Sequence, residues 1–136
     1  MNQTIRQLLD TADLLLTDTG EPAASAAAAT GPAASAAAAA SRCRGAVFAL
    51  RTALESAVAD RLTVHRAPRA IREGTQRAEF LWLRGCAEAG TARRAKAVWS
   101  QLCLGCHCHQ YEIGPTEDQV RAWRTEVAAV VALLAH

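Results

Sequence analysis

The stretch Ala92-Arg-Arg-Ala-Lys-Ala-Val-Trp-Ser-Gln-Leu-Cys-Leu-Gly-Cys-His-Cys-His-Gln-Tyr111 sets the architecture of the chain. Its apolar residues recur every three or four positions, which is the spacing of one face of an α-helix. That face holds Ala95, Val98, Trp99, Leu102 and Cys106. We therefore expect one unbroken amphipathic helix from Ala92 to about Tyr111, with Gly90-Thr91 as the preceding stop and N-cap.

A second helix is expected on the C-terminal side of this stretch. Ile113-Gly-Pro115 predicts a turn, and Thr116 with Gln119 predicts a capping box. The helix that follows runs to the C-terminus. Its apolar stripe is Val120, Trp123, Val127, Val130, Val131 and Leu134.

Three helices are expected before Ala92. The first, Gln3 to Thr17, has an apolar face formed by Ile5, Leu8, Leu9, Ala12, Leu15 and Leu16. The second, Ser41 to Val64, has an apolar stripe of Val47, Leu50, Leu54, Val58 and Leu62. Its solvent-exposed face is expected to hold Arg44, Arg51, Glu55 and Arg61. The third, Arg69 to Glu88, begins after Pro68 and turns Ile71, Ala78, Leu81 and Trp82 inward, although Gly74 and Gly85 weaken it.

Between the first two helices lies a duplication. Pro22-Ala-Ala-Ser-Ala-Ala-Ala-Ala-Thr30 recurs as Pro32-Ala-Ala-Ser-Ala-Ala-Ala-Ala-Ala40. Alanine favours helix but buries little surface, so the first copy is expected to be a linker and the second to extend the following helix. The predicted organisation is an N-terminal helix in residues 1–18, an alanine-rich linker or helix extension in 19–40, and a bundle domain in 41–136. With no strand pattern and short connections, we predict an all-α, up-down bundle of four to five antiparallel helices.

Bulk properties narrow the function only slightly. The chain has 136 residues and a formal net charge of +2, too small by itself to imply nucleic-acid binding. We expect no export signal and no membrane span, and hence a cytoplasmic protein. In a reducing compartment its five cysteines are expected to be free thiols or metal ligands.

The residues from Trp99 to Thr116 hold three of the five cysteines, two of the four histidines and the only tyrosine. One interpretation is covalent haem, because Cys103-Leu-Gly-Cys106-His107 matches the c-type attachment motif. A four-helix bundle with this motif resembles cytochrome c′. The missing export signal and the helix that follows the motif weigh against it.

A second interpretation is a zinc site built from Cys103, Cys106, His107, Cys108 and His109. Zinc requires four ligands in a tetrahedron, and the remaining donors are Cys43, Cys86, His65 and His136. None of these forms a second pair at ligand spacing. We therefore predict no resident cofactor, with haem and zinc as alternatives.

The third interpretation places most of the sulfur atoms in the protein interior. His107 and His109 lie about 200° apart around a helix, so at least one imidazole is expected to face solvent or a second copy of the chain. Tyr111 and Glu112 stand beside them. Alternatively, these are ordinary surface or core side chains that take no part in a site.

The pattern Trp99-x-x-Leu102-x-x-x-Cys106-His107-x-His109-x-Tyr111-Glu112, followed by Pro115-Thr116, resembles HEPN-type helical domains. It is similar to small actinobacterial proteins whose stretch reads like Ala-Cys-His-His-His-x-Tyr-Glu-Leu-x-Pro-Thr. The similarity covers about Arg77 to Trp123. In it Cys103 falls at an ordinary variable position, which makes the haem-motif match accidental.

The resemblance implies a homodimer in an RNA-directed or toxin–antitoxin-like pathway, with RNA or a protein antitoxin as partner. Many HEPN domains are metal-independent endoribonucleases that use an arginine and, after four to six intervening residues, a histidine. Here no arginine stands at that spacing, so a catalytically degenerate member is an open alternative. If the chain is catalytic, His107 or His109 is expected to be the acid–base group and Tyr111 to orient it. Arg93, Arg94 or Arg77 would hold phosphate, unless they only form solvated helix faces.

A further alternative is a partner-docking protein without catalysis. Exposed apolar surface near Trp82 or Trp123 would be its docking site.

Overall fold

The computed structural model of the chain describes residues 2–17, 21–107 and 113–136. Within these ranges every regular element is a helix and no strand occurs, which confirms the all-α prediction. The helices are α1 Gln3–Thr17, α2 Glu21–Val64, α3 Arg69–Arg72, α4 Gln76–Leu83, α5 Ala89–Cys106 and α6 Glu117–Leu134. No helix among the described residues combines the length and apolar character needed to cross a membrane.

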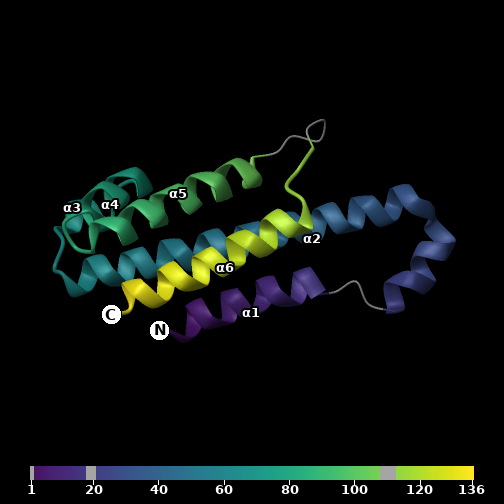
Figure 1. The fold of residues 1–136 in the computed structure, drawn as a ribbon, viewed down its shortest axis with the longest axis horizontal. Helices are drawn as coiled ribbons and strands as arrows, with labels where there is room; N and C mark the ends of the chain where they lie inside the picture. The colour runs from purple at the N-terminus through teal and green to yellow at the C-terminus, as the bar shows by residue number, and fades with distance from the viewer. Residues whose placement is uncertain (1, 18–20, 108–112) are drawn as a thin grey trace.

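Helix α2 is the centre of the bundle. In Figure 1, α1, α5 and α6 lie alongside it, and both ends of the chain lie at the same end of the molecule. The five residues predicted as its stripe, from Val47 to Leu62, are all fully buried. Spacing alone therefore located the core of the longest helix.

The predicted ends and buried faces of α1 and α6 are also confirmed. Ile5, Leu9, Ala12 and Leu16 are buried in α1, while Leu8 and Leu15 pack against the core from its edge. Five of the six stripe residues of α6 are buried, and Trp123 is half-buried. Thr116 accepts a hydrogen bond from the Gln119 backbone N–H, and the Gln119 side chain accepts one from the Thr116 backbone N–H, so the capping box is present.

The alanine repeats are helical. Both copies lie within α2, and Gly31 separates them with a non-helical backbone (φ 83°, ψ 172°) that glycine adopts without strain. The first copy is therefore helical where a linker was expected, and the second extends the long helix as predicted. Residues 33–38 are exposed, in keeping with the small apolar surface of alanine.

The prediction of one helix from Arg69 to Glu88 is wrong. The chain forms α3 and α4 with a break between them, where Gly74 follows the last turn of α3 and Thr75 caps α4. A side chain on Gly74 would lie only 2.7 Å from the Ala70 carbonyl oxygen, so this tight turn requires glycine. The inward face changes as well: Glu79, Phe80 and Leu83 are buried, whereas Leu81 and Trp82 are exposed.

Two smaller predictions need correction. Helix α5 begins at Ala89, because the Glu88 carboxylate, and not Thr91, accepts hydrogen bonds from the Gly90 and Thr91 backbone N–H groups. Three charged residues of α2 expected to face water are half-buried. These are Arg51, Glu55 and Arg61, and each makes a polar contact described below.

Candidate functional site

The cysteine–histidine stretch lies at the C-terminal end of α5. The helix does not continue to Tyr111: it ends at Cys106, and His107 caps it with a non-helical backbone while its N–H donates to the Leu104 carbonyl oxygen at 3.2 Å. Gly105 weakens the last turn. The prediction of an unbroken helix over residues 92–111 therefore fails at His107. Cys108, His109, Tyr111 and Glu112 lie outside the described residues.

Gly105 has a packing role at this end of α5. A β-carbon there would lie 3.2 Å from both the Trp123 ring and a Val47 methyl group. The absent side chain lets α5 approach α2 and α6 closely. Trp123 is thereby half-buried in the bundle, and of the two predicted docking tryptophans only Trp82 is exposed.

The thiols of Cys103 and Cys106 are half-buried beside Arg51 of α2. Burial raises the pKa of Cys103, and the nearby guanidinium of Arg51 offsets this only in part. Arg51 is itself engaged, since its Nε donates to Glu55 Oε1 at 2.8 Å. The Cys103 sulfur of the metal-free chain is therefore a protonated thiol at neutral pH, which disfavours nucleophilic attack by it.

A polar cluster runs from these thiols along the seam between α2 and α5. The same Glu55 oxygen accepts a second hydrogen bond from the Trp99 indole N–H at 3.0 Å. Burial raises the pKa of the neighbouring Glu79 carboxyl, and the negative charge of Glu55 raises it further. Glu79 is only 4% exposed, and its Oε2 has no hydrogen-bond partner in the described part of the chain.

A metal centre is not formed by the residues that the structure describes. Within residues 2–17, 21–107 and 113–136, no three His, Cys, Asp or Glu side chains come together as metal ligands would. Cys103, Cys106 and His107 belong to this part of the chain. Cys43 and Cys86, the other candidate sulfur ligands, are buried elsewhere in the core.

The two arginines predicted to hold phosphate have different surroundings. Arg94 forms a two-pronged ion pair with Glu126 of α6, at 2.7 and 2.9 Å. This carboxylate already occupies the guanidinium fork that a phosphate would need. Arg93 forms no such pair with any residue that the structure describes, and it lies in a surface groove.

This groove, which we call the cationic groove, lies between the end of α4 and the first half of α5. Its volume is about 400 Å³, and it is lined by Phe80, Arg84, Ala92, Arg93, Lys96, Ala97 and Ser100. Three of these side chains are cations and none is an acid. Phe80 forms its floor, with its ring centroid 4.9 Å from that of Trp99.

The Glu88 carboxyl group interacts electrostatically with one cation of the groove, Arg93. Its pKa is lowered, first by the Gly90 and Thr91 backbone N–H groups that it caps and to a smaller degree by Arg93. The Glu88 carboxylate is thus occupied by its hydrogen bonds at the N-terminus of α5. The groove has space and charge for an anion, and its mixed lining suits a phosphate attached to a less polar group.

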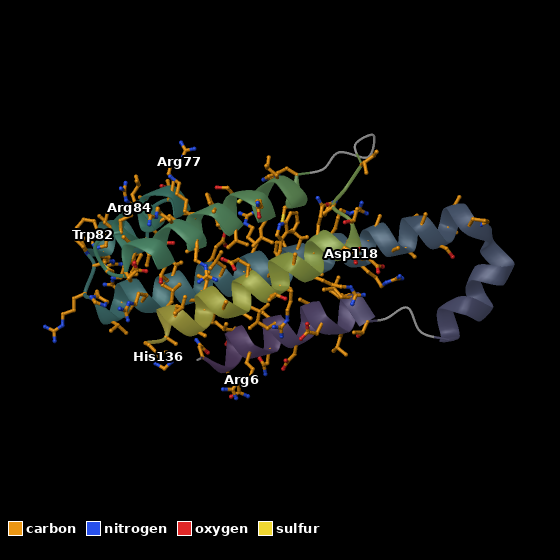
Figure 2. The ribbon with its side chains drawn as sticks, in the orientation of Figure 1. Arg6, Arg77, Trp82, Arg84, Asp118 and His136 are labelled. Atoms are coloured by element: carbon orange, nitrogen blue, oxygen red, sulfur yellow. The ribbon has the colours of Figure 1, made fainter. Side chains whose placement is uncertain are left out.

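Sequence reasoning found Arg93 but missed Arg84 and Lys96. Arg93 and Lys96 are three residues apart on α5 and therefore share a helix face, a signal visible in the sequence. Arg84 follows α4, and only the tertiary fold brings it to that face. Arg77 is exposed, and Figure 2 shows it projecting from the same end of the molecule as Arg84.

Within one chain the cationic groove and His107 are separated. Arg93 precedes His107 by fourteen residues, which corresponds to about 21 Å along a helix. A histidine and an arginine acting on one phosphate must both lie within hydrogen-bond reach of it. One copy of the chain does not provide that arrangement with these two residues.

Comparison with known proteins gives no relative for this chain. No family model matches it, and neither a curated protein nor a solved structure does. The HEPN resemblance therefore stays a prediction.

Proposed function

We propose that the chain is a HEPN-like helical bundle that binds RNA through the cationic groove. The observation that carries this proposal is the meeting of Arg84, Arg93 and Lys96 around one groove whose lining holds no acid. Phosphate contacts by arginine and lysine supply most of the affinity of sequence-independent nucleic-acid binding. A net charge of +2 does not reveal such a local concentration of cations.

The up-down antiparallel arrangement of HEPN domains is part of the proposal. Two contacts support it. Arg61, near the end of α2, donates to the Cys86 carbonyl oxygen just before α5 begins, and Gly105, near the end of α5, lies against Val47 in α2. Neighbouring helices that run in opposite directions make such contacts.

A homodimer, or a complex with a protein antitoxin, is the second part. Leu104 and Ile113 are strongly exposed on either side of the segment that contains His107 and His109. A second copy that covers them can bring its own His107 towards the arginines of the first. This would bridge the separation of about 21 Å between Arg93 and His107 that a single helix imposes.

If the assembly is catalytic, His107 or His109 transfers protons at the RNA 2′-hydroxyl, with Tyr111 orienting the imidazole. Arg93 holds the phosphate and Arg84 and Lys96 bind the flanking backbone. The reaction then requires no metal ion. A degenerate member of the family binds RNA in the same groove without cleaving it.

The test incubates the full chain with labelled single-stranded RNA in EDTA and follows binding and cleavage in parallel. A ribonuclease is expected to lose about 100-fold or more of its rate in the His107→Ala/His109→Ala variant and none in the control His65→Ala. Binding without cleavage by the wild type identifies the degenerate form. A wild type that neither binds nor cleaves the RNA would contradict the proposal.

A further inference from the structure

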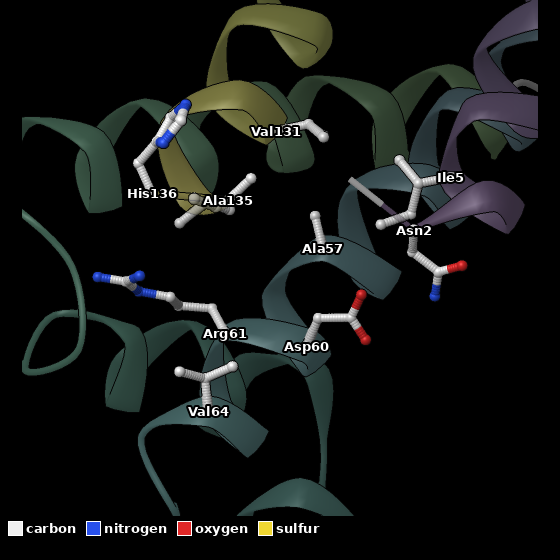
Figure 3. Close-up of a pocket in the computed structure, with 10 residues that line it drawn as sticks. Asn2, Ile5, Ala57, Asp60, Arg61, Val64, Val131, Ala135 and His136 are labelled. Atoms are coloured by element: carbon white, nitrogen blue, oxygen red, sulfur yellow. The ribbon is translucent and has the colours of Figure 1, made fainter.

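The start of α1 and the ends of α2 and α6 lie at the same end of the bundle (Figure 1), and a cavity lies among them (Figure 3). Its volume is about 310 Å³, at the lower end of the range for small-molecule sites. Buried apolar side chains form its floor: Ile5, Ala57, Val131 and Leu134. This site is separate from the cationic groove, and the two share no lining residue.

Arg61 is the group that gives this cavity its chemistry. It is half-buried, and its Nε donates to the Cys86 carbonyl oxygen at 2.9 Å, which fixes the direction of the guanidinium. Arg51 and Arg124 are also half-buried, and each is paired with a carboxylate. Among the described residues Arg61 has no carboxylate within ion-pair distance, so a partly desolvated positive charge at the cavity edge lacks its counter-ion.

The remaining polar groups set the orientation of a ligand. In Figure 3 the nitrogen atoms of Arg61 and His136 lie on one side of the cavity. The Asp60 carboxylate lies on the other side and points towards Asn2. An anionic group is therefore attracted to the Arg61 side, while Asp60 disfavours a second negative charge.

We propose that this cavity binds a small monocarboxylate with an apolar body. The carboxylate pairs with the terminal nitrogens of Arg61, and the body covers Ile5, Val131 and Leu134. Arginine binds a carboxylate through two parallel hydrogen bonds, and the apolar floor adds the free energy of surface burial. The proposal does not depend on RNA binding.

Calorimetric titration of the full chain with octanoate tests the site, with octanol as an uncharged probe of the same length. We expect saturable octanoate binding and at least about tenfold weaker binding of octanol, as one charge-assisted pair implies. Arg61→Met is expected to raise the octanoate Kd by about tenfold or more, and the control Arg44→Met to leave it unchanged.

Arg61→Met also removes the hydrogen bond from Arg61 to the Cys86 carbonyl oxygen, so a second variant that leaves this bond intact is needed. Asp60→Asn removes an exposed negative charge from the rim and is expected to tighten octanoate binding by about two- to fivefold. Absence of saturable binding, equal binding of octanol and octanoate, or weaker binding by the Asp60 variant would each overturn the proposal. Circular dichroism of each variant checks that it is folded.

Discussion

Replacement of Phe80 by alanine is expected to lower the free energy of unfolding by about 3–5 kcal/mol. Phe80 is 1% exposed and packs its ring on Trp99, so truncation leaves a cavity between α4 and α5. The same ring is the floor of the cationic groove. The change is therefore expected to damage both the packing of the short α4 helix and the groove.

Urea denaturation followed by circular dichroism measures this effect. The matched control is Leu81→Ala, since Leu81 is the next residue of the same helix but is 52% exposed. Its loss is expected to stay within about 0.5 kcal/mol, as for most surface substitutions. Equal destabilisation by the two variants would show that α4 does not pack through Phe80.

Replacement of Glu79 by methionine is expected to raise the free energy of unfolding at pH 7 by about 1–3 kcal/mol, the usual cost of a buried polar group without a partner. Glu79 Oε2 is buried and has no partner among the described residues. Methionine has a similar length and no such group. The cluster around Glu55 would keep its bonds to Arg51 and Trp99.

The stability difference between the Glu79→Met variant and the wild type is expected to depend on pH. Burial and then the charge of Glu55 raise the pKa of Glu79 above its ordinary value of 4.5, so the folded protein binds this proton more tightly than the unfolded chain. The stabilisation from that proton is complete below pH 4.5 and is lost as the pH rises through the raised pKa. The advantage of the Glu79→Met variant should therefore grow from acid to neutral pH.

Denaturation at pH 4 and pH 7 separates this effect from a simple gain in hydrophobicity. The control Glu73→Met replaces an exposed glutamate that pairs with Arg69 on the surface, and its effect should be small at both values. An advantage of Glu79→Met that does not change with pH would contradict the titration. A loss of stability at pH 7 would show that the carboxyl makes an unrecognised favourable contact.

The sequence predicted those helices whose buried face and N-cap depend only on residues close together in the chain. The three-and-four spacing of α1, α2 and α6 identified their buried faces, and Thr116 with Gln119 identified the start of α6, because both partners of a capping box are close in sequence. The prediction of one helix from Arg69 to Glu88 was wrong because the local pattern there is ambiguous. Its apolar residues fit more than one helical face, and the turn at Gly74 selects the face that buries Phe80.

The candidate site was only partly predictable. Arg93 and Arg94 are neighbours in sequence, but Glu126 on another helix engages one and not the other. Arg84 reaches the groove from outside α5, and the half-buried charge of Arg61 comes to line a cavity only where α1, α2 and α6 meet. The tertiary structure sets these surroundings, and helical periodicity contains no information about them.

The salt dependence of RNA binding tests most directly whether Arg84, Arg93 and Lys96 together bind the phosphates of RNA. We compare wild type, a variant with all three changed to glutamine, and a control of equal charge with Arg6, Arg42 and Arg44 changed to glutamine. Fluorescence anisotropy with single-stranded RNA should give a slope of log K against log salt that is shallower by about 2 in the groove variant, at about 0.7 per phosphate contact. The control should keep the wild-type slope, whereas equal slopes for wild type and the groove variant would contradict the claim.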